Sequence, residues 1–189
     1  MKFKHFGNSY DVIKKALIAW FGECGVRNAH LMFTEAVTPD RSTLFARFPA
    51  EKLVSTEERT PRTNRAGYFL PCRGAGKLFL DPDTGISLKT LRDAKSINYI
   101  SGPEIIDLNL TRPESLMVVF DQRYGRAEDS SRKFKRNYSS LQLMDFTALS
   151  YASHAPSPIL SAKVQSVVEA HYMLLKKSDL LLFRLIRSP

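Results

Sequence analysis

Four side chains that could do acid–base or metal chemistry each follow an apolar run of the kind that forms a buried strand. The carboxyl ends of parallel strands meet at one edge of a sheet, and ligands of α/β proteins bind outside that edge. We therefore expect these groups to lie near one another. Carboxylates and an imidazole so placed are typical of general acid–base catalysis. The candidate catalytic residues are Asp81, Asp83, Asp121 and His154.

The segment Asp81–Gly85 contains two of these carboxylates within a short loop. Pro82 fixes one backbone angle and removes an N–H donor, while Gly85 permits a turn with a positive φ. The loop is therefore expected to be stiff and to hold Asp81 and Asp83 in fixed directions. A tight turn whose aspartates bind local backbone amides is the other interpretation.

Apolar periodicity predicts helices and strands that alternate along the chain. The predicted helices are Ser9–Phe21, a short one with Leu44, Phe45 and Phe48, one that starts at Ser101–Glu104, a basic one over Ser131–Leu143, and one near Ala162–Leu175. The predicted strands are His30–Val37, Lys52–Ser55, Lys77–Leu80, Leu116–Phe120, Ala148–Ala152 and Leu180–Ile186, with loops over Glu57–Arg65 and around Pro156 and Pro158. This alternation predicts an α/β fold, a three-layer Rossmann-like arrangement with a mostly parallel sheet, formed by residues 1–189 as a single domain.

Composition excludes several classes of protein. The 189 residues are 43% hydrophobic, which is enough for one ordinary core and excludes a disordered or collagen-like chain. Cys24 and Cys72 have no metal-ligand spacing, so neither structural zinc nor a disulfide scaffold is indicated. No apolar run is long enough to span a membrane and no secretory signal is evident, so we expect a cytoplasmic protein without membrane contact.

The chain is basic, with a net charge of +9 and a pI near 9.7. Such an excess favours polyanionic partners through steering and counterion release. The charge is concentrated in one segment, which we expect to contact the phosphates of a nucleic acid; a solvated surface segment is the alternative. The candidate phosphate-binding residues are Arg123, Arg126, Arg132, Lys133 and Arg136.

Two short segments, about a tenth of the chain, carry a family resemblance. His5–Lys14 reads HFGNSYDVIK and is similar to the N-terminal segment of the large-subunit ribosomal RNA adenine methyltransferase J family. Leu78–Pro82 reads LFLDP and resembles the segment after the fourth strand of Rossmann-fold methyltransferases that modify nitrogen on bases. The resemblance implies S-adenosylmethionine as cofactor and Asp81 near the acceptor amine. It implies that the residues on the cofactor side are Gly7, Asn8, Asp11 and Lys14.

Three functions remain open from the sequence. The first is an S-adenosylmethionine-dependent methyltransferase acting on nucleic acid, or a degenerate member that keeps the fold without the reaction. The second is a nuclease or phosphoesterase in which Asp81, Asp83 and Asp121 bind Mg²⁺, with His154 as general base. The third is a non-catalytic protein that binds nucleic acid through its basic segment.

Overall fold

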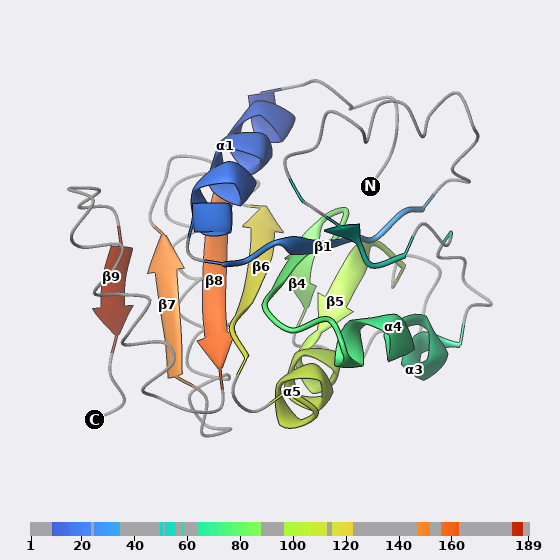
Figure 1. Ribbon diagram of the computed structural model, residues 1–189. Helices are drawn as coiled ribbons and strands as arrows, with labels where there is room; N and C mark the ends of the chain where they lie inside the picture. The colour runs from blue at the N-terminus through green and yellow to red at the C-terminus, as the bar shows by residue number, and fades with distance from the viewer. Residues whose placement is uncertain are drawn as a thin grey trace.

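The computed structural model describes residues 9–23, 25–34, 50, 52–55, 58, 64–87, 97–112, 115–122, 147–151, 156–162 and 183–186 (Figure 1). The helices are α1 (Ser9–Glu23), α3 (Arg65–Tyr68), α4 (Leu70–Arg73) and α5 (Gly102–Leu110) within these ranges. The strands there are β1 (Asn28–Leu31), β2 (Lys52–Leu53), β3 (Leu78–Asp81), β4 (Gly85–Ser87), β5 (Tyr99–Ser101), β6 (Met117–Gln122), β7 (Thr147–Tyr151), β8 (Pro156–Ala162) and β9 (Phe183–Ile186).

Two sheets are formed by the described strands. The larger has the order β2-β1-β3-β6-β8-β7-β9, and the smaller pairs β4 with β5 in parallel. The pairings β2–β1, β1–β3 and β3–β6 are parallel, whereas the pairings β6–β8, β8–β7 and β7–β9 are antiparallel. The α/β class with a four-stranded parallel sheet is thereby confirmed. The single domain and the three-layer Rossmann-like arrangement stay predictions.

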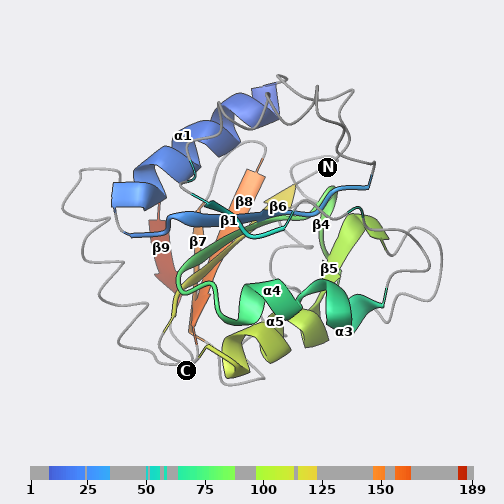
Figure 2. The same ribbon diagram turned by 45° about the vertical axis from the view of Figure 1, so that its right-hand side comes forward.

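Helices lie on both sides of the larger sheet. Figure 2 shows α1 on one side and α3, α4 and α5 on the other. Strand side chains alternate between these faces: Leu78 and Leu80 of β3 pack in a buried cluster with Ile105 and Leu108 of α5. On the α1 side, the rings of Phe79 and Phe120 lie 6.3 Å apart.

Helix α1 confirms the helix predicted over Ser9–Phe21 and ends two residues later, at Glu23. The buried side chains described on α1 recur at helical spacing, and the first of them is a lysine. They are Lys14, Leu17, Ile18 and Phe21.

Helix α5 begins at the residues that the sequence indicated. The Ser101 hydroxyl accepts a hydrogen bond from the N–H of Glu104, and the Glu104 carboxylate accepts one from the N–H of Ser101, which forms a capping box. Arg65 of α3 donates two hydrogen bonds of 2.7 Å to the same carboxylate. One glutamate therefore both caps α5 and joins it to α3.

Several element boundaries differ from prediction. Strand β1 begins two residues before His30 and ends at Leu31, with only an isolated bridge from Phe33 to Glu58 beyond it. The turn predicted around Pro156 and Pro158 is wrong, because both residues belong to β8. Proline removes a hydrogen-bond donor, but its fixed φ is compatible with extended backbone.

Four short elements were not predicted: α3, α4, β4 and β5. Each spans three or four residues, too few to show a period. The helices predicted around 44–48 and over 131–143 lie outside the described residues, as does the one near 162–175 apart from Ala162, the last residue of β8. Among the described helices, none has the length and apolarity needed to cross a membrane.

Candidate functional site

The strand order places a topological switch point between β1 and β3. From β1 the chain adds β2 on one side, and it later returns to add β3 on the other side of β1. In parallel sheets the crevice outside the carboxyl ends of two such strands is where ligands bind. Leu31 of β1 pairs with Asp81 of β3, so the last residues of both strands lie side by side at this point.

Asp81 points to the α1 side of the sheet, where Lys14 meets it. The Lys14 Nζ donates a hydrogen bond to Asp81 Oδ2 at 3.0 Å. The side chains are 4% and 0% exposed, so this ion pair is buried. The same ammonium lies 5.0 Å from the centre of the Phe120 ring, a cation–π contact.

The ion pair with Asp81 explains why a charged residue, Lys14, lies on the buried face of α1. Lys14 lies three and four residues before Leu17 and Ile18, so all three share one buried face of the helix, and the Lys14 ammonium reaches the end of β3. A buried ammonium is stable only beside a compensating charge, which Asp81 provides. Lys14 and Asp81 were expected near the site from separate segments, and their contact was not predicted. The signal that could have shown it is a lysine at a core position of an amphipathic helix.

The loop after β3 is fixed by two hydrogen bonds to distant residues. Thr84 N–H donates to Asn98 O at 2.8 Å. The N–H of Ile86 donates to Asp121 Oδ1 at 2.9 Å. Gly85 has a φ of 124°, which a side chain rarely permits. The positive φ expected at Gly85 is therefore present, and Asp121 is one of the groups that hold the residues after the loop.

The three candidate metal ligands do not converge. Asp81 and Phe120 occupy adjacent positions of β3 and β6, so Asp121 falls on the opposite face from Asp81. Asp121 is buried and binds Ile86, whereas Asp83 is half-buried in the loop. Within the described ranges, no group of three or more His, Cys, Asp or Glu could hold a metal ion. The magnesium alternative therefore gains no support from this part of the chain.

The remaining candidate residues lie mostly where the structure gives no description. Asp11 belongs to α1 by its backbone. The others lie outside the described residues: Gly7, Asn8, Arg123, Arg126, Arg132, Lys133, Arg136 and His154. Their roles stay predictions.

Two titratable groups lie on the α5 side, away from the switch point. Burial raises the pKa of the Cys72 thiol to about 12, although the charge of Arg112 partly opposes this shift. Burial lowers the pKa of Arg112 to about 10, which the neighbouring Cys72 partly offsets. A protonated, fully buried thiol is a poor nucleophile, so Cys72 is a core residue.

No protein-family model, no curated protein and no solved structure matches this chain.

Proposed function

We propose that this chain binds S-adenosylmethionine at the carboxyl ends of β1 and β3 and methylates nitrogen in a nucleic acid. The observation that carries the proposal is the ion pair between Lys14 and Asp81. These residues come from the two segments that resemble base-modifying methyltransferases, and they are 67 positions apart in the chain. Their contact at a switch point is what one shared site requires.

The two charges at this site are suited to the cofactor and to the acceptor. Lys14 offers a cation that can attract the carboxylate of the cofactor, and Asp81 offers an anion that can hold the acceptor amine. When bound, S-adenosylmethionine supplies an electrophilic methyl group on its sulfonium. The Asp81 carboxylate would hold the acceptor amine by accepting a hydrogen bond from its N–H. This hydrogen bond would replace the one that Lys14 donates to Asp81 in the structure. Phe120 would keep the Lys14 ammonium in place during the exchange.

A nucleic-acid substrate is supported by the charge of the chain. The net charge of +9 attracts phosphate backbones, and the basic segment predicted to contact them follows β6 directly in the sequence. Binding of an RNA oligonucleotide should weaken steeply with salt, as measured by fluorescence anisotropy. Reversing the charge of Arg132, Lys133 and Arg136 together should reduce the salt slope, whereas an unchanged slope would contradict this part of the proposal.

The test separates cofactor binding from transfer. Calorimetric titration with S-adenosylmethionine should show binding to the wild type, and Lys14→Met should weaken it. Asp81→Asn should keep the cofactor affinity but lower methyl transfer to total RNA by about 10²–10⁴-fold, because it loses the carboxylate that positions the amine. Asp107→Asn, an exposed carboxylate on α5, is the matched control. Circular dichroism establishes that each variant is folded.

Absence of cofactor binding by the folded wild type would refute the proposal. Titration with Mg²⁺ in the same buffer tests the phosphoesterase alternative. Metal binding without cofactor binding would favour that alternative.

A further inference from the structure

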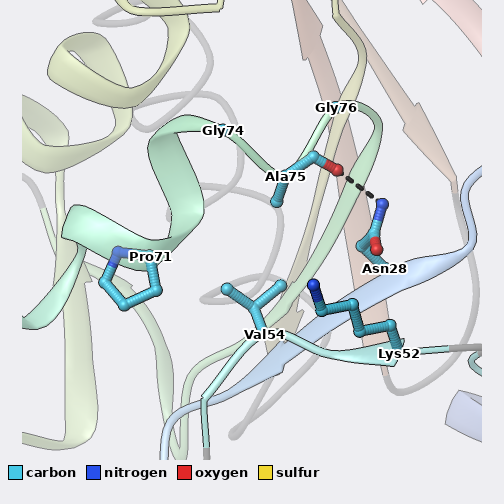
Figure 3. Close-up of a pocket in the computed structure, with 7 residues that line it drawn as sticks. All are labelled: Asn28, Lys52, Val54, Pro71, Gly74, Ala75 and Gly76. Carbon is cyan, nitrogen blue, oxygen red and sulfur yellow. Dashed lines mark hydrogen bonds between the residues drawn. The ribbon is translucent and has the colours of Figure 1, made fainter.

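A recess lies at the opposite ends of the strands from the switch point. It has a volume of about 530 Å³ and opens between the starts of β1 and β2, helix α4, and the turn before β3 (Figure 3). Pockets of this size hold small molecules. The described residues that line it are Asn28, Lys52, Val54, Pro71, Gly74, Ala75 and Gly76.

Lys52 gives the recess a positive charge. Figure 3 shows its amine directed into the space between Val54 and Asn28, toward the turn at Ala75. Lys52 forms no ion pair with any described residue of the chain, unlike Lys14. Lys52 is exposed at the rim of the recess, and an ammonium there with no carboxylate partner among the described residues favours an anionic ligand.

The turn that faces Lys52 is held rigidly. The Asn28 side-chain amide donates hydrogen bonds to the carbonyls of Ala75 and Lys77. Gly76 adopts a φ of 63°, which explains the glycine at that position. The recess is therefore preformed, which lowers the entropy lost when a ligand binds.

Gly74 is a glycine that the fold itself does not require. Its φ is −97°, an ordinary value for any residue, and a Cβ built there would meet no atom within 4 Å. A glycine in open space beside a lysine leaves room for a ligand that a larger side chain would obstruct. The N–H groups of Gly74 and Ala75 both donate to the carbonyl of Cys72, so the positive charge for a phosphate comes from Lys52. Val54 and Pro71 add apolar surface that a ring can cover.

We infer that this recess binds a nucleotide-sized phosphomonoester, with the phosphate between Lys52 and the Gly74–Gly76 turn and the ring against Val54 and Pro71. The site is independent of the proposed methyl transfer, because it lies at the amino ends of the strands. A bare phosphate would leave the apolar walls uncovered, and a polymer would need a groove longer than this recess.

The probes are AMP, adenosine, inorganic phosphate and a short RNA oligonucleotide, titrated into the full chain by calorimetry. AMP should bind more tightly than adenosine or phosphate. Lys52→Gln should weaken AMP binding by about tenfold or more, through loss of the charge-assisted contact. Gly74→Ala should weaken it without lowering thermal stability, since alanine is compatible with this backbone conformation. Lys15→Gln on α1 is the charge-matched control and should bind AMP like the wild type.

Three results would overturn the inference. The first is that AMP does not bind. The second is that AMP binds with an affinity that neither Lys52→Gln nor Gly74→Ala changes. The third is that the oligonucleotide or inorganic phosphate binds at least as tightly as AMP and that this binding depends on Lys52. Titration of Lys52→Gln with S-adenosylmethionine separates the two sites. If Lys52→Gln weakens AMP binding and leaves the cofactor affinity unchanged, the recess is a second site. If the cofactor does not bind the wild type, the proposed methyl transfer fails, but the AMP titrations still test the recess.

Discussion

Removing Lys14 should destabilise the protein strongly, because it leaves the charge of Asp81 buried and uncompensated. At the observed separation of 3.0 Å and an effective dielectric constant of about 20, the Coulomb attraction of the pair is about 5.5 kcal/mol. Much of this offsets the loss of hydration, so the pair contributes little net stability. Removing one partner of such a pair costs about 3–5 kcal/mol. For a chain of 189 residues, that corresponds to a fall in Tm of about 6–20 °C.

The assay is urea unfolding of wild type, Lys14→Met, Asp81→Asn and the double variant. The double variant removes both charges, so it should be less destabilised than Lys14→Met alone, which gives a favourable coupling energy in the double-mutant cycle. Lys15→Met changes the neighbouring, half-buried lysine and should cost less than about 1 kcal/mol. A loss below about 1 kcal/mol in Lys14→Met, or additive effects in the cycle, would refute the buried ion pair and with it the geometry of the proposed site.

Three further predictions concern Asp121, Ser101 and Cys72. Asp121→Ala leaves the Ile86 N–H without its acceptor and should lower the free energy of unfolding by about 1–3 kcal/mol in urea titration. Asp121→Asn retains an oxygen and should lower it less, and equal effects of the two variants would contradict this hydrogen bond. Ser101→Ala removes the cap of α5 and should cost about 1 kcal/mol, with Ser101→Thr as the control that keeps a hydroxyl; no loss in Ser101→Ala would contradict the capping role. Because burial raises the pKa of Cys72 from 9.0 to about 12, its contribution to stability is present below pH 9 and falls as the pH rises toward 12. The difference in unfolding free energy between wild type and Cys72→Ala should therefore shrink by about 1 kcal/mol between pH 8 and pH 10, and a constant difference would show that the thiol titrates normally.

Helix α5 and the strands β3 and β6 could be predicted from the sequence because each shows a complete local signal, whereas the prolines of β8 led to a wrong prediction of a turn. The start of α5 is marked by Ser101 and Glu104, a capping box that depends only on residues three apart. The apolar runs ending at Leu80 and Phe120 predicted β3 and β6 to within two residues. Short elements such as α4 and β4 could not be predicted, because three or four residues show no period and tertiary contacts determine them.

The candidate site was only partly predictable. Asp81 and Lys14 were both named from short motifs, and the expectation that ligand groups follow strand ends selected Asp81 and Asp121 correctly as strand-terminal residues. Their directions were not predictable. A shift of one position along neighbouring strands moves a side chain to the other face of the sheet, which separates Asp121 from Asp81.

The sequence by itself determined the α/β class, the positive φ of Gly85 and the cap of α5, since these depend on backbone preferences and contacts between near neighbours. Tertiary structure alone decided that Lys14 neutralises Asp81, that Asp121 binds Ile86, and that Lys52 faces the glycine turn across a recess. Strand order and register bring these groups together from positions 22 to 67 residues apart, and no local pattern records such long-range pairings. A charged residue at a core position is the one trace that these contacts leave in the sequence, because burial of a charge requires a partner.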